Sequence, residues 1–149
     1  MLCPMSDYLI SESAVIAATP QQLFDLVANP AMHPVIDGSG SVKSFRGEAG
    51  QRLEMGSTFG MAMHLGGNYK ITNTVVEFDE PRQIAWRHFN GHIWRYIFEP
   101  VDGGTKVTEQ WDATKVYNRL ALKVAGFPKR NRAGIQATLV RLAEVTAQH

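Results

Sequence analysis

The chain has 149 residues, of which 44% are hydrophobic and 19% charged, a composition typical of globular proteins. Its 15 Lys and Arg against 14 Asp and Glu give a net charge of +1, without the basic footprint of nucleic-acid-binding proteins. No apolar stretch approaches the roughly 20 residues that a membrane span needs. We therefore predict one domain over residues 1–149, with no nucleic-acid partner and no membrane span.

The first ten residues lack the basic start and the apolar core of a secretion signal. Residues 1–6 are expected to be a frayed N-terminus, and Cys3, the only cysteine, lies within them. A disulfide framework and a thiolate metal cluster are therefore not expected. These features favour a cytoplasmic protein.

Residues 8–17 are rich in β-branched side chains in partial alternation, which predicts a strand. Thr19 and Pro20 are the residue types of a helix N-cap and of a first helical position. A short helix is predicted over 21–28 and one further helical turn over 31–36, so one or two short helices follow the first strand. The first helix would bury a stripe of side chains at helical spacing, namely Leu23, Phe24 and Val27.

The middle of the chain consists of strand-like runs separated by short connections. Each connection carries Gly, Pro, Asn or Asp, the residues of hairpin turns, so consecutive strands are expected to be antiparallel neighbours. Six strands are predicted, over residues 41–46, 52–64, 69–78, 83–89, 92–99 and 105–116.

The last third of the chain changes to helical periodicity. We predict one long C-terminal helix that is kinked or restarted near Pro128. Its apolar positions are Leu120, Val124 and Phe127, then Ile135, Leu139 and Leu142. This order of elements predicts an α+β fold in which a seven-stranded antiparallel sheet wraps around the long C-terminal helix.

Two arginines test the register of the hairpin around Asn90 and Gly91. Arg87 and Arg95 should both face water, because an unpaired guanidinium is costly to bury. A three-residue loop over 89–91, with Gly91 in the left-handed conformation, puts both arginines on the outer face. It also pairs Trp86 with Trp94, and His88 with His92.

This register predicts a mostly aromatic inner face with a few polar tips. Strand 69–78 is not assigned to a face, because Lys70 and Glu77 have opposite parity and imply a bulge or an exposed end. A ligand pocket and a plain core share this pattern. The expected inner residues are Ile84, Trp86, His88, His92, Trp94, Tyr96, Phe98, Val107, Glu109 and Trp111, joined by Phe59, Met61, Met63 and Leu65.

Five inner or loop residues are candidates for chemistry. Glu109 on an apolar face should have a raised pKa and serve as acid, base or ligand anchor; the alternative is a place at the cavity mouth, paired with an arginine. His88 and His92 could orient a polar ligand group or shuttle a proton, and two histidines alone make a poor metal site. Tyr96 offers a phenol to a ligand carbonyl. His33 is either a gate residue or, with Pro34, a helix stop.

Four segments together resemble a known family: PRQIAWR at 81–87, WRYIFEP at 94–100, GGTKVT at 103–108 and NRAGIQATLVRL at 131–142. They resemble the polyketide cyclase/dehydrase branch of the START-like (SRPBCC) superfamily, over most of the chain. The resemblance implies a helix-grip fold with a deep cavity between the sheet and the last helix. Members bind lipids, sterols, polyketides or plant hormones, and some are aromatase/cyclases; fold analogy does not choose among these activities.

We therefore predict a carrier or sequestering protein that binds a hydrophobic small molecule, such as a lipid or polyketide, in this cavity. The alternatives are a polyketide aromatase/cyclase using Tyr96, His88 or Glu109, and a non-catalytic interaction protein with a filled cavity. The loop 31–40 and the turn at Gly66 and Gly67 would gate access. No cofactor or metal is expected, and the chain would be a monomer or a homodimer. The predicted ligand contacts are Phe59, Met61, Met63, Trp86, His88, Trp94, Tyr96, Glu109 and Trp111.

Overall fold

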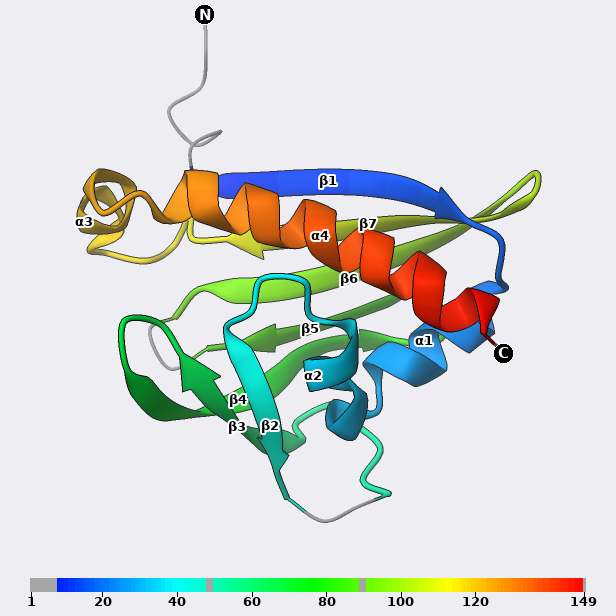
Figure 1. Cartoon of the computed structure of the whole chain (residues 1–149), viewed down its shortest axis with the longest axis horizontal. Helices are drawn as coiled ribbons and strands as arrows, with labels where there is room; N and C mark the ends of the chain where they lie inside the picture. The colour runs from blue at the N-terminus through cyan, green and yellow to red at the C-terminus, as the bar shows by residue number, and fades with distance from the viewer. Residues whose placement is uncertain (1–7, 48–49, 89–90, 149) are drawn as a thin grey trace, which may run out of the picture.

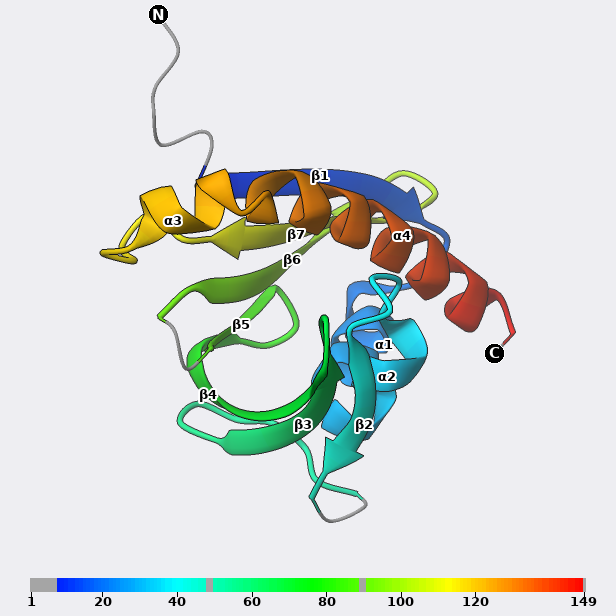
Figure 2. The same cartoon turned by 60° about the vertical axis from the view of Figure 1, so that its left-hand side comes forward.

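A computed structural model describes residues 8–47, 50–88 and 91–148 (Figure 1). The predicted frayed N-terminus, with Cys3, lies outside these residues. The seven strands form one antiparallel sheet in the order β1-β7-β6-β5-β4-β3-β2, and a long C-terminal helix lies across it. Figure 2 shows how the sheet curls, so that β2 and β3 face the side on which this helix lies. The predicted α+β architecture is confirmed.

The strands agree with the predicted runs to within one residue except at four ends, one of which is that of β5, which stops at Arg87 while the predicted end at 89 lies outside the described residues. β3 begins at Thr58 rather than at 52, because Gly56 makes a turn with a φ of 82°. β7 stops at Asp112, whose carboxylate accepts hydrogen bonds from the backbone and hydroxyl of Thr114, and β6 runs on to Val101. The strands are β1 Leu9–Ile16, β2 Val42–Arg46, β3 Thr58–His64, β4 Asn68–Asp79, β5 Gln83–Arg87, β6 Ile93–Val101 and β7 Gly104–Asp112.

Helix α1 (Pro20–Val27) begins with a reciprocal cap. The Thr19 hydroxyl accepts from the Gln22 backbone N–H, and the Gln22 side chain accepts from the Thr19 N–H. The predicted stripe of Leu23, Phe24 and Val27 is fully buried. The short 3₁₀ helix η2 (Pro30–Met32) and the single turn α2 (His33–Ile36) follow, in place of one helical turn over 31–36.

The C-terminal helix is restarted, as predicted, but at a glycine. Helix α3 (Arg119–Val124) ends before Gly126, whose φ is 83°, and α4 (Phe127–Ala147) carries Pro128 in its first turn, where proline is tolerated. Two of the apolar positions at helical spacing, Leu120 and Val124, face outward. These side chains are 66% and 81% exposed, because α3 turns Leu122 inward instead.

The register around Gly91 is confirmed as far as the described residues reach. Trp86 pairs with Trp94, the His88 N–H donates to the His92 carbonyl, and Gly91 has a φ of 92°. Residues 89 and 90 lie outside the described part of the chain. Both arginines project from the outer face, but only Arg87 is exposed, so the prediction that Arg95 faces water is wrong.

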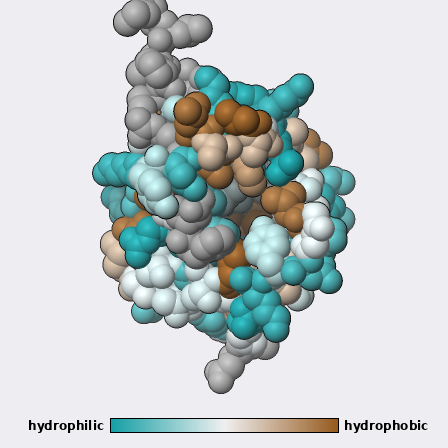
Figure 3. All heavy atoms as spheres, turned by 90° about the vertical axis from the view of Figure 1, so that its left-hand side faces the viewer, coloured by the Kyte–Doolittle hydropathy of each residue, from teal (hydrophilic) through white to brown (hydrophobic). Residues whose placement is uncertain are grey.

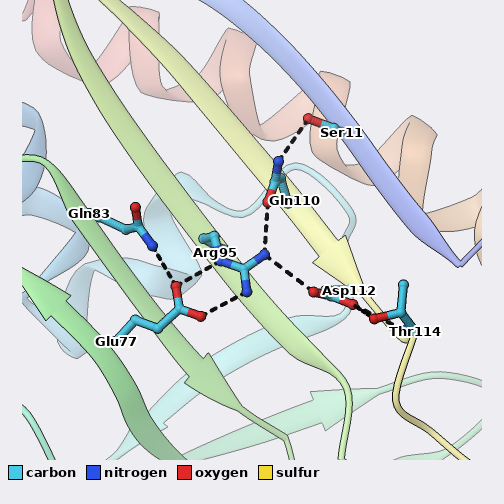
Figure 4. A network of polar contacts seen from close by, with 7 residues as sticks. All are labelled: Ser11, Glu77, Gln83, Arg95, Gln110, Asp112 and Thr114. Carbon is cyan, nitrogen blue, oxygen red and sulfur yellow. Dashed lines mark hydrogen bonds and ion pairs between the residues drawn. The ribbon is translucent and has the colours of Figure 1, made fainter. Parts of the chain in front are cut away.

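Arg95 is held in a polar network on the outer face of the sheet (Figure 4). Its guanidinium donates to both carboxylate oxygens of Glu77 at 2.8 Å and to Gln110 at 2.8 Å, and its side chain is only 15% exposed. Asp112 lies 3.4 Å away. A satisfied guanidinium can be covered where an unpaired one would not be.

A β-bulge in β4 settles the strand that the sequence left unassigned. The pairing with β5 shifts between Val75 and Glu77, which reverses the alternation. Ile71 and Asn73 therefore turn inward before the bulge, while Glu77 after it points outward to Arg95. The bulge was one of the two explanations that the opposite parity of Lys70 and Glu77 offered.

Candidate functional site

A cavity of about 440 Å³ lies between the inner face of the sheet and the C-terminal helices. The sheet supplies its floor through β3 to β7, while α3, α4 and the segment after α2 close the other side. The apolar lining residues are Ile36, Val42, Met61, Met63, Leu65, Tyr69, Ile71, Trp86, Trp94, Trp111, Leu122, Phe127 and Ile135.

Eight of the nine predicted ligand contacts line this cavity, and Leu65 lies at its edge, 37% exposed. Phe59 does not line it. Its ring packs in the core, 5.3 Å from the ring of His33 and 5.4 Å from that of Trp86, both of which line the cavity. The eight lining residues are Met61, Met63, Trp86, His88, Trp94, Tyr96, Glu109 and Trp111.

His33 is a buried wall residue of the cavity. Its Nε2–H donates to the Val27 carbonyl at 2.7 Å, and its ring stacks on Trp86 with 4.8 Å between ring centres. Burial lowers its pKa to about 4, so the imidazole is neutral at pH 7. His33 is the C-cap of η2 and also the first residue of α2, so one helical element ends there and the next begins.

Tyr96 and Glu109 are paired residues of β6 and β7 at the centre of the floor. Burial raises the pKa of Glu109 to about 8; the hydrogen bond from the Tyr96 hydroxyl opposes this rise, and the charge of Asp37 adds to it. Glu109 is 5% exposed, and its Oε1 has no hydrogen-bond partner among the described residues. Its partner is thus a phenol and not the arginine of the alternative interpretation.

His88 and His92 are stacked, with ring centres 4.5 Å apart, as the register predicts. Burial lowers their pKa values to about 4 and about 3, the proximity of His88 adding to the effect on His92. Both rings are therefore neutral at pH 7. Within residues 8–47, 50–88 and 91–148, no three His, Cys, Asp or Glu side chains are placed to hold a metal ion.

Sequence reasoning missed several polar lining residues. Asn73 is 3% exposed and its Oδ1 has no partner in the described part of the chain. The parity change in its strand was the signal that could have placed it. Asp37, Thr138 and Arg130 come from the α2 loop and from α4, whose positions over the sheet no alternation pattern predicts.

The loop after α2 is tied to the C-terminal helix. The Gly38 N–H donates to the Thr138 hydroxyl at 2.9 Å. A Cβ on Gly38 would lie 2.3 Å from the backbone carbon of Ala137, so only glycine permits this approach. Asp37 accepts hydrogen bonds from Ser39, Gly40 and Val42, which orders the rest of the loop.

This architecture, a curved antiparallel sheet gripping a C-terminal helix over an internal cavity, is the helix-grip fold of the START-like superfamily. Residues 9–147 match the model of the family described as polyketide cyclase/dehydrase and lipid transport. The chain therefore belongs to this family. In the part of the chain that is described, no helix has the length and apolar character to cross a membrane.

The chain is similar to the uncharacterized protein Rv0088 of Mycobacterium tuberculosis, with 37% identity over 145 residues. That match covers 93% of this chain and 64% of the relative, so the chain spans about two thirds of the relative's length. Two solved structures share the fold. An AHSA1-like protein from Aeromonas hydrophila has a TM-score of 0.66 at 20% identity, with 95% of each chain covered. Protein NE0264 from Nitrosomonas europaea has a TM-score of 0.73 at 15% sequence identity, with 96% of each chain covered.

Proposed function

We propose that the chain binds a hydrophobic small molecule between the sheet and α4 and acts as its carrier or sequestering protein. The observation that carries the proposal is the cavity, whose volume of about 440 Å³ lies within the range of small-molecule sites. Its apolar walls and few polar groups also fit such a site. The membership of a lipid transport and polyketide cyclase family supports the same function.

The charge state of the cavity floor favours uncharged ligand groups there, while the charged lining residues Asp37 and Arg130 stand on the opposite side. Glu109 is mostly protonated at pH 7, and the three lining histidines are uncharged, because their pKa values lie far below 7. An ionised ligand group would meet no countercharge at the floor and would pay the full cost of leaving water. A neutral ligand with hydroxyl or carbonyl groups would avoid this cost.

Among the described residues, polar atoms without hydrogen-bond partners lie at two levels of the floor. Glu109 Oε1 stands at the level of Tyr96, and His92 Nδ1 lies four residues earlier in the chain, just before β6 begins. Four residues of a strand span about 13 Å. The Trp94 and Trp111 pair lies between these levels. A ligand with an apolar body and an oxygen function near each end would satisfy both levels.

Binding can be tested directly. Native mass spectrometry of the purified protein should find a bound apolar compound, and an uncharged fluorescent probe such as Nile red should bind and be displaced by that extract. Trp94→Ala removes an aromatic wall residue and should change probe affinity severalfold. Val15→Ala, at a 61% exposed position of β1, should leave the affinity unchanged. A protein that excludes every apolar probe would refute the proposal.

A second candidate function is catalysis of enolisation or dehydration in the same cavity. The observation that favours it is the Tyr96 and Glu109 pair, since an acid with a pKa of about 8 suits proton transfer at neutral pH. Glu109→Gln separates the two functions. For a carrier this variant should retain transport of the extracted ligand, whereas an enzyme would keep binding and lose turnover.

A further inference from the structure

The short helix α3 presents apolar side chains to solvent at one end of the molecule. Leu120 and Val124 lie one helical turn apart and are 66% and 81% exposed, and Tyr117, just before the helix, is 97% exposed. Figure 3 looks at this end and shows an apolar patch above a hollowed part of the surface. Clustered apolar side chains of this kind mark an interaction surface.

The chain segment that carries this patch is strongly basic. No acidic residue occurs between Asp112 and Glu144, so residues 113–143 carry a charge of +7 and the rest of the chain −6. Lys115, Lys123 and Lys129 are exposed beside or within α3. The seven basic residues of the segment are Lys115, Arg119, Lys123, Lys129, Arg130, Arg132 and Arg141.

We infer that α3 and its flanks form a docking surface for an anionic lipid bilayer. Exposed apolar residues with lysines around them match an interfacial helix, which inserts its apolar side chains while its cations contact lipid phosphates. A second copy docked through the same face would bring Lys115, Lys123 and Lys129 against their own counterparts, which disfavours self-association through this face.

The docking surface on α3 and one end of the cavity lie on opposite sides of the same helix. Leu122, on the opposite side of α3 from Leu120 and Val124, lines the cavity, as does Phe127 at the start of α4. A bilayer bound at α3 would therefore be separated from the cavity by this helix alone. The inference goes beyond the proposed binding function, since docking requires no occupied cavity.

Vesicle binding of the full chain tests the inference. In flotation assays, vesicles of phosphatidylcholine with phosphatidylglycerol should bind the protein, whereas pure phosphatidylcholine vesicles should bind it much less, and added salt should release it. The double variant Leu120→Gln, Val124→Gln should bind at least about tenfold more weakly. Lys115→Glu with Lys129→Glu should have a comparable effect.

Matched controls lie elsewhere on the surface. Val140→Gln changes a 60% exposed valine further along α4, and Lys106→Glu changes an exposed lysine of β7. Each should bind vesicles like the unchanged protein. Equal, salt-independent binding to neutral vesicles, no binding at all, or a dimer that the double variant dissociates would each overturn the inference. Probe uptake by the cavity would persist in all three cases, so the proposed function would stand or fall separately.

Discussion

The Tyr96 hydroxyl donates a hydrogen bond to the Glu109 carboxyl across β6 and β7, and the second carboxyl oxygen of Glu109 has no partner among the described residues. Tyr96 is itself buried, which raises the pKa of its phenol well above its usual value. The pair thus places an uncharged polar group at neutral pH on a floor that is mostly aromatic. This is the point at which a bound molecule would be recognised or changed.

The pKa of Glu109 predicts how stability depends on pH. Because the folded-state pKa of about 8 exceeds the ordinary 4.5, the folded protein holds a proton that the unfolded chain has lost between these values. The free energy of unfolding of the unchanged protein should therefore fall as pH rises from 4.5 to 8, whereas Glu109→Gln lacks this loss. The difference between the two proteins should grow by up to about 5 kcal/mol in favour of the variant. Urea denaturation across this range measures the difference. The exposed Glu54→Gln should show no such trend, and a flat difference for Glu109→Gln would contradict the assignment.

The buried histidines predict the opposite slope in acid. His33, His88 and His92 have pKa values of about 4, 4 and 3, below the ordinary 6.5, so the unfolded chain takes up protons that the folded protein does not. Stability should fall as pH drops below 6.5, by about 1.4 kcal/mol per pH unit for each histidine involved. Together with Glu109, this places the maximum near pH 6.5. His92→Gln should reduce the fall of the free energy of unfolding in acid by about 1.4 kcal/mol per pH unit, the contribution of one histidine. The exposed His64→Gln should leave this pH dependence unchanged.

Removing Arg95 should destabilise the protein without affecting the cavity. The guanidinium lowers the pKa of Glu77 by its hydrogen bonds, and Arg95→Ala would leave Glu77 and Asp112 without their cation. We expect a loss of about 2 kcal/mol in the free energy of unfolding. The exposed Arg87→Ala should cost less than about 0.5 kcal/mol. Probe affinity should be the same in both variants, because the network lies on the outer face.

Gly38→Ala should loosen the loop that lies against α4. Its Cβ would collide with Ala137 and force the loop outward, which should cost about 1–3 kcal/mol and raise the rate of probe exchange. Gly67→Ala, in the other predicted gate, meets no atom within 4 Å and needs no positive φ, so its stability should be unchanged. Stopped-flow probe release and thermal unfolding provide the measurements. Unchanged exchange in Gly38→Ala would rule out gating by this loop.

Much of the fold followed from local chemistry. The cap at Thr19, the hairpin residues and the alternation along β5 and β6 are short-range features, so the elements and the Trp86 to Trp94 register were predictable. Phe59 shows that alternation along a strand does not predict which inner residues line the cavity. It alternates correctly onto the inner face, yet it packs against His33, which comes from another part of the chain.

The sequence by itself determined which face the residues of regular strands such as β5 and β6 occupy, because the two-residue period of a strand depends only on neighbours along the chain. In β4 the bulge reverses that period, and the sequence alone assigned no face. Tertiary structure decided which part of that face stays open. The pairing of Glu109 with Tyr96, the covering of Arg95 by Glu77 and the outward turn of Leu120 all depend on how the curved sheet and the helices are placed. These placements bring together residues far apart in sequence, and no local pattern encodes their distances.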